Sequence, residues 1–125
     1  MDLYEETDFA RFAECFQAIS YELRQKILML LQEREYSVHE LVDRFGVSQP
    51  TVSRNLGVLK RAGLVRDRRV GQQIYYALDE KGVQDACAGF FGRFKCCAPL
   101  VRRISGTSTL PRWAQASSKG PDTTR

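Results

Sequence analysis

The sequence predicts a mainly α-helical fold that carries one two-stranded β-hairpin. Apolar residues recur at helical spacing between residues 7 and 62, and serines that favour helix N-termini precede the successive segments. Residues 72–78 instead alternate with a period of two and are rich in β-branched and aromatic residues, which is typical of a strand. A further helical repeat begins at Asp79.

The composition is that of one globular domain. The 125 residues fit a single core, and a hydrophobic fraction of 43% is too high for a wholly disordered chain. We expect the folded domain to span residues 1–104 and the polar residues 105–125 to form a disordered tail. No apolar run is long enough to cross a bilayer, and the acidic N-terminus lacks the pattern of a signal peptide. We therefore expect a cytoplasmic protein with no membrane partner.

Three helices are expected in the first part of the chain. Ser20 separates two apolar repeats between residues 7 and 32 and is expected to cap the second helix. Ser37 and Glu40 form a capping-box pattern at the start of a short third helix, and Gly46 is expected to end it.

A fourth helix follows the third after a tight turn. Ser48 is its expected N-cap, and Pro50 fits the first turn, where its missing N–H costs nothing. Val52, Leu56 and Leu59 then form one apolar stripe. Two helices joined in this way make a helix-turn-helix pattern.

The hairpin and a last helix complete the predicted fold. Residues 64–69 and 72–78 flank a Val70-Gly71 turn, and Gly71 supplies the positive φ that such a turn needs. The last helix is expected over residues 79–98, with apolar positions from Val83 to Cys97 in steps of 4, 3, 4 and 3 that suit pairing with another helix. The fold class is therefore a winged helix-turn-helix with a two-stranded wing.

The fourth helix and the hairpin carry residue types that bind DNA. If the apolar stripe faces inward, the polar side chains of this helix lie mostly on exposed sides, where Gln and Asn suit adenine, Arg suits guanine, and Ser, Thr and Lys suit phosphates. Arginines before the hairpin turn would reach the adjacent backbone or minor groove. The candidate DNA-binding residues are Ser48, Gln49, Thr51, Ser53, Arg54, Asn55, Lys60, Arg66, Arg68 and Arg69.

Residues 48–78 resemble the core of the ArsR/SmtB family of metalloregulatory repressors: they read SQPTVSRNLGVLKRAGLVRDRRVGQQIYYAL. Residues 18–31, AISYELRQKILMLL, are similar to the second helix of that family, but depart from it at Tyr21-Glu22, where many members have Asp-Pro. The likeness covers Phe16 to Leu78, about half of the chain. It implies a homodimer built on the first and last helices, with double-stranded operator DNA as the partner.

Cys96 and Cys97 are the candidate ligands of an inducer. In a reducing compartment thiols serve packing, metal binding or redox chemistry, and soft thiolates select soft ions such as trivalent arsenic or antimony. Lys95, Arg93 and Arg102 surround the pair and are expected to favour the thiolate form. The pair resembles the arsenite site that some family members carry at the end of the last helix. No organic cofactor is expected.

The third ligand is left open. Family dimers pack the first and last helices together, often across subunits. The resemblance therefore makes Cys15 a candidate third ligand, either within one chain or from the partner chain. Otherwise a small thiol, hydroxide or methyl group completes a two-sulfur site, and a methylated arsenical would suit it. Cys87 lies ten residues before Cys97, roughly 15 Å along one helix, and is interpreted as a core residue.

Two other functions are considered. One is a repressor on the same fold that senses thiol oxidation or persulfides, through a disulfide between Cys15 and Cys96 or Cys97. The other is a protein-interaction module that has lost DNA binding. An enzyme is not expected, because the sequence offers no Ser-His-Asp set, phosphate loop or supported carboxylate pair.

Overall fold

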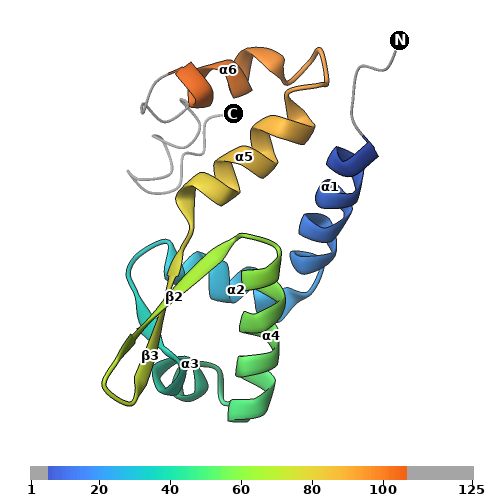
Figure 1. Cartoon of the computed structure of the whole chain (residues 1–125). Helices are drawn as coiled ribbons and strands as arrows, with labels where there is room; N and C mark the ends of the chain where they lie inside the picture. The colour runs from blue at the N-terminus through green and yellow to red at the C-terminus, as the bar shows by residue number, and fades with distance from the viewer. Residues whose placement is uncertain (1–5, 107–125) are drawn as a thin grey trace, which may run out of the picture. The chain divides into compact units, whose positions relative to one another are not determined.

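The structure, a computed structural model, describes residues 6–106 (Figure 1). The described residues form two compact units, divided after Val83. Its elements, in order, are α1 (Glu6–Ala18), α2 (Glu22–Leu31), β1 (Tyr36–Ser37), α3 (Val38–Phe45), α4 (Gln49–Arg61), β2 (Val65–Val70), β3 (Gln73–Leu78), α5 (Glu80–Phe91) and α6 (Ala98–Gly106).

The core of the first unit is built around α4. Val52, Leu56 and Leu59 are fully buried, which confirms the predicted apolar stripe. They share the interior with Ile27 of α2 and Leu41 of α3, which are also fully buried. Burial of these aliphatic side chains is the main stabilising contribution to the helix-turn-helix arrangement.

Local capping sets where α3 and α4 begin. The Ser37 hydroxyl accepts from the Glu40 amide at 3.0 Å, and the Glu40 carboxylate accepts from the Ser37 amide at 2.8 Å, which completes the predicted capping box. Gly46 ends α3 with a φ of 66°, and Ser48 caps α4 by accepting from the Thr51 amide.

The expected cap at Ser20 is wrong. Its hydroxyl donates back to the Gln17 carbonyl oxygen at 2.7 Å, so it satisfies the end of α1 instead of the start of α2. Tyr21 occupies the N-cap position of α2 and forms no side-chain cap bond there.

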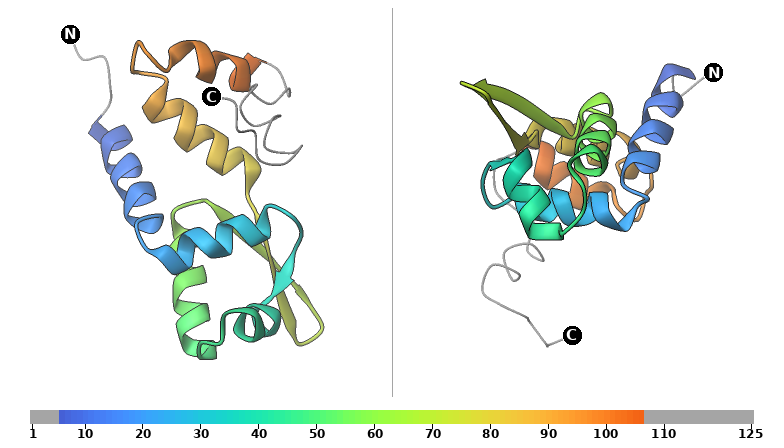
Figure 2. Two further views of the ribbon diagram at one scale, coloured as in Figure 1. Left: turned by 180° about the vertical axis from the view of Figure 1, so that it is seen from behind. Right: turned by 90° about the horizontal axis from the view of Figure 1, so that it is seen from below.

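Three antiparallel strands form the sheet, in the order β1-β3-β2. The predicted hairpin is confirmed, but its turn is Gly71-Gln72 instead of Val70-Gly71, because Val70 ends β2 and pairs with Gln73. Gly71 has a φ of 62°, and the hairpin projects away from α2, α3 and α4 as a wing (Figure 2). The sequence did not predict β1, because a strand of two residues leaves no periodicity. Tyr36 and Ser37 pair with Tyr76 and Tyr75 of β3.

The second unit corrects the prediction of one long last helix. α5 ends at Phe91, and a separate helix, α6, begins at Ala98. A Cβ at Gly92 would press into the Ala88 carbonyl oxygen and lie 3.2 Å from Cγ1 of Val101, so α6 packs closely against this glycine. Pro99 falls in the first turn of α6, where proline is favoured. The expected tail overlaps α6 at residues 105–106, and its remainder, 107–125, lies outside the described residues.

The first testable consequence concerns Gly82, near the start of α5. A Cβ at this position would press into the backbone carbonyl group of Gly63, so we expect Gly82→Ala to lower the free energy of unfolding, measured by urea denaturation. Gly57→Ala is the matched control, because its Cβ would meet only the Arg61 side chain, at 3.6 Å. Within α4 the control change should stabilise by about 1 kcal/mol. Equal effects of the two variants would contradict the close approach at Gly82.

Candidate nucleic-acid interface and thiol site

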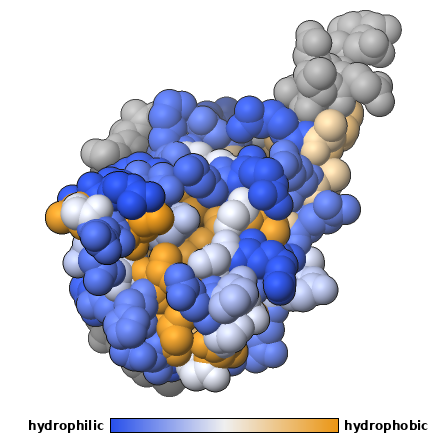
Figure 3. All heavy atoms as spheres, turned by 60° about the horizontal axis from the view of Figure 1, so that its bottom comes forward, coloured by the Kyte–Doolittle hydropathy of each residue, from blue (hydrophilic) through white to orange (hydrophobic). Residues whose placement is uncertain are grey.

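The first turns of α4 present polar side chains to solvent. Gln49, Ser53 and Arg54 are exposed, and Ser48 and Thr51 share a hydroxyl hydrogen bond of 2.9 Å at the helix start. Figure 3 turns α3, the start of α4 and the tip of the wing toward the reader, and hydrophilic residues predominate there around smaller apolar areas. A helix start of this kind offers free backbone N–H groups to a phosphate.

Asn55 differs from its predicted exposure. It is only 9% exposed, because its amide lies on the inner side of α4. Nδ2 donates to the Thr51 carbonyl oxygen at 2.8 Å, and Oδ1 accepts from Arg24 at 3.2 Å. Because these bonds engage the amide within the fold, Asn55 is not available to contact a base, contrary to the prediction.

Arg24 joins three helices around this amide. Besides Asn55 of α4, its guanidinium donates to the Ala18 carbonyl oxygen at 2.7 Å and to that of Gln17 at 3.3 Å, both at the end of α1. It also lies 4.3 Å from the ring centroid of Tyr21. Arg24 thereby fixes α4 against α1 and α2.

The basic residues of the interface divide into engaged and available groups. Lys60 forms an ion pair with Asp67 at 3.1 Å, and Arg66 donates to the Leu78 carbonyl oxygen. Arg68 binds the Glu35 carboxylate with contacts of 2.8 to 3.2 Å. Two other predicted DNA-binding arginines are exposed and form no hydrogen bond or ion pair with the described residues: Arg54 and Arg69.

Cys96 and Cys97 lie in the turn before α6. Their sulfur atoms are 3.8 Å apart, and Cys96 is exposed. The hydrogen bond with Cys96 raises the pKa of the Cys97 thiol, and burial adds to the shift. The expectation that basic neighbours would favour the Cys97 thiolate is therefore wrong. One of those neighbours, Arg93, donates to the Gly89 carbonyl oxygen.

The other two cysteines are less accessible. Cys15 is 7% exposed, its thiol donates to the Ala62 carbonyl oxygen at 3.5 Å, and burial raises its pKa. Burial also raises the pKa of Cys87. The break after α5 removes the helical separation that set Cys87 apart, and Cys87 is close enough to Cys97 to contribute to raising its pKa. Among residues 6–106, no three His, Cys, Asp or Glu side chains are grouped so that they could hold a metal ion.

Sequence reasoning missed two residues of this interface. Glu35 lies 33 positions before Arg68, and no periodicity or motif links them. Arg24 lies in the stretch that resembles the second helix of the family, but its bonds to main-chain carbonyls leave no sequence pattern.

The helix-turn-helix of α3 and α4, with α4 as its recognition helix, and the basic hairpin of β2 and β3 define the chain as a winged helix-turn-helix protein. Residues 22–67 match the family described as "Bacterial regulatory protein, arsR family". The chain is 39% identical over 71 residues to the transcriptional repressor SdpR of Bacillus subtilis, a match that covers 57% of this chain and 79% of SdpR. The chain belongs to the ArsR/SmtB family.

Further relatives agree with this assignment. The biofilm growth-associated repressor of Xylella fastidiosa is 41% identical over 54% of this chain and 60% of its own length. Among solved structures, HlyU from Vibrio cholerae is similar with a TM-score of 0.58 and 30% identity, covering 82% of this chain and all of that one. No helix within residues 6–106 is both long and apolar enough to span a membrane.

Loss of the Arg24 contacts should destabilise the fold. Arg24→Gln removes charge-assisted hydrogen bonds to two helices, and we expect the free energy of unfolding to fall by about 1–3 kcal/mol. Lys26→Gln is the control on the same helix, since it breaks only an exposed ion pair with Glu22 and should change little. Urea denaturation measures both, and equal stabilities would refute the role given to Arg24.

Proposed function

We propose that this protein is a cytoplasmic transcriptional repressor that binds double-stranded operator DNA as a homodimer. The observation that carries the proposal is the exposed side of α4 beside the wing, where Arg54 and Arg69 have no partner among the described residues. A helix of this kind fits the major groove, while wing cations reach neighbouring phosphates. The names of the relatives SdpR and the Xylella repressor support repression as the outcome.

The homodimer is proposed from apolar side chains that the single chain leaves exposed. Phe9 of α1 is 46% exposed. In the second unit, Phe91 and Phe94 are 39% and 44% exposed, and none of the described residues of α5 is buried. Large exposed aromatic residues on helices favour burial against a second copy. Two recognition helices would then meet two half-sites of an inverted repeat.

Arg54 supplies the test of DNA binding. Arg54→Ala should weaken binding to a duplex that the protein has selected from a random-sequence pool, and should lower the slope of log K against log salt by about 1 if Arg54 contacts a phosphate. If it contacts a base instead, the variant should lose discrimination by about 1–3 kcal/mol. Arg44→Ala, an exposed arginine of α3, is the control. Fluorescence anisotropy that shows no change for Arg54→Ala would count against the interface.

We further propose that Cys96 and Cys97 bind trivalent arsenic or antimony, inorganic or methylated, and that binding releases the operator. If the ion–sulfur bonds are as long as Zn–S bonds, about 2.3 Å, and the angle between them is roughly 90–110°, the two sulfurs lie roughly 3.3–3.8 Å apart. The two thiols, 3.8 Å apart, therefore need little movement. Each thiol sulfur replaces one hydroxide of the arsenite, and each thiol proton leaves with that hydroxide as water, without a change of oxidation state.

Cys15 is the weaker candidate for a third sulfur. Its burial and its hydrogen bond to Ala62 must both be given up before it can bind an ion. We therefore propose a site of two protein sulfurs, in which hydroxide, a small thiol or a methyl group completes the coordination.

Serine substitutions test the inducer site. Cys96→Ser and Cys97→Ser should each abolish the loss of operator binding that arsenite causes in the wild type, while operator affinity without arsenite stays unchanged. Cys87→Ala and Cys15→Ala are the matched controls and should retain the response. Fluorescence anisotropy with and without arsenite measures all four, and a response that survives Cys96→Ser would eliminate the two-sulfur site.

Thiol oxidation is the second candidate signal. The exposure of Cys96, with a second sulfur beside it, is the observation that favours it. Mass spectrometry after mild oxidation, without arsenite, separates oxidation sensing from metalloid sensing. Only a redox sensor would lose operator binding when Cys96 is oxidised.

A further inference from the structure

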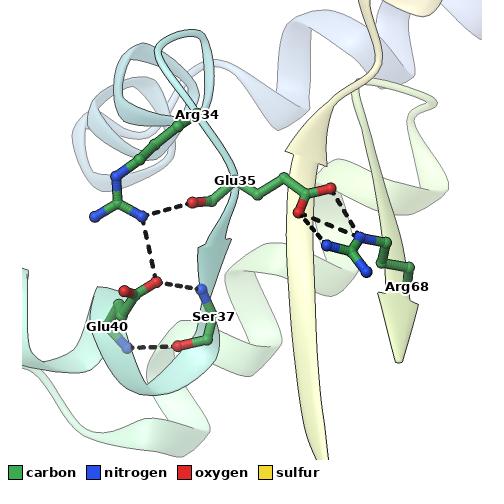
Figure 4. Close-up of polar contacts among 5 residues, drawn as sticks. All are labelled: Arg34, Glu35, Ser37, Glu40 and Arg68. Atoms are coloured by element: carbon green, nitrogen blue, oxygen red, sulfur yellow. Dashed lines mark hydrogen bonds and ion pairs between the residues drawn. The ribbon is translucent and has the colours of Figure 1, made fainter. Parts of the chain in front are cut away.

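One side-chain interaction crosses the whole sheet. Arg68 lies on β2, an edge strand, and pairs in register with Tyr75 of the central strand β3, which in turn pairs with Ser37 of β1. The Arg68 guanidinium lies 5.5 Å from the Tyr75 ring centroid. It binds Glu35, two residues before Ser37 on the far side of the sheet (Figure 4). The side chain thus connects the two outer edges of the sheet.

The contact between Arg68 and Glu35 has the geometry of a strong exposed ion pair. Nε of Arg68 donates to both carboxylate oxygens, at 3.0 and 3.2 Å, and Nη2 donates to Oε1 at 2.8 Å. The Arg68 hydrogen bonds lower the pKa of Glu35, and the same bonds raise the pKa of Arg68. Two-pronged contacts of this kind are the exposed pairs that contribute measurably.

Glu35 is itself held by neighbours that lead to α3. Nη1 of Arg34 donates to the Glu35 carbonyl oxygen at 2.7 Å and forms an ion pair with Glu40 at 3.5 Å. Glu40 belongs to the capping box that starts α3. Figure 4 shows the resulting chain of contacts from the wing strand β2 to the first turn of the helix-turn-helix.

We propose that Glu35 is a positioning residue for DNA binding, and that Arg68 sets the angle of the wing instead of contacting a phosphate. This inference rests on the proposed binding of operator DNA. The Lys60–Asp67 ion pair joins β2 to α4, whereas the Arg68–Glu35 pair joins β2 to the start of α3 through Arg34 and Glu40. With Arg68 engaged, Arg69 is the wing arginine left for the DNA backbone.

Glu35→Gln and Arg68→Gln test the proposal when they are compared with the double variant. Each single change should weaken operator binding about two- to fivefold, because the coupling energy of an exposed ion pair corresponds to a change in affinity of this size. The double variant should be no weaker than either single variant. The slope of log K against log salt should stay at the wild-type value, because no phosphate contact is lost.

Two further variants separate position from charge. Glu33→Gln removes a nearby exposed acidic group that has no ion pair in the described structure, and it corrects for the general gain in affinity that follows loss of a negative charge. The reversed pair, Glu35→Arg with Arg68→Glu, keeps the net charge and should restore affinity to within about twofold of the wild type.

Opposite results would overturn the inference. If Arg68 contacts a phosphate, Arg68→Gln lowers the salt slope by about 1, Glu35→Gln strengthens binding by releasing the arginine, and the reversed pair stays weak. Wild-type protein that selects no duplex would instead refute the proposed function, and the positioning role with it. Amide hydrogen exchange distinguishes that failure, because loss of the ion pair should still speed exchange in β2 of Glu35→Gln, relative to Glu33→Gln.

Discussion

The orientation of the recognition helix depends on the guanidinium of Arg24. This guanidinium holds the last carbonyls of α1 on one side and the Asn55 amide of α4 on the other. α1 also carries Phe9, one of the exposed apolar side chains on which the proposed dimer depends. A displacement of α1 at a subunit interface would therefore be passed to α4 through direct hydrogen bonds.

Local signals in the sequence were sufficient for most of the fold. The capping box at Ser37, the left-handed glycine at position 46, and the cap at Ser48 were each predicted from residues within one turn. The buried stripe of α4 followed from its periodicity, and the hairpin from alternation around Gly71. In each case the residues that determine the structure are only a few positions apart, which is the range over which sequence patterns predict structure best.

The expected cap at Ser20 failed locally, because its hydroxyl bonds to the Gln17 carbonyl oxygen three residues earlier. Other wrong predictions involve residues farther apart in the sequence. Asn55 has the side chain of a base-reading residue, but Arg24, 31 positions earlier, binds its amide in the interior. After α5 ends, Val101 of α6 packs close to Gly92, a contact that a heptad-like seam does not reveal. The candidate interface was likewise predicted residue by residue. The pairing of Arg68 with Glu35 could not be predicted in this way, because it depends on the register of the strands.

The adjacency of Cys96 and Cys97 has a consequence for selectivity. An atom bonded to sulfurs of successive residues closes a small ring that contains only the peptide unit between them and their side-chain carbons. In the proposed site, closure would restrict the backbone dihedrals between Cys96 and Cys97, so a bound ligand would act on the conformation of the turn before α6. A reagent that forms a single bond to sulfur cannot close such a ring. The turn would thus distinguish ligands that form two bonds to sulfur from ligands that form one, whatever their size or charge.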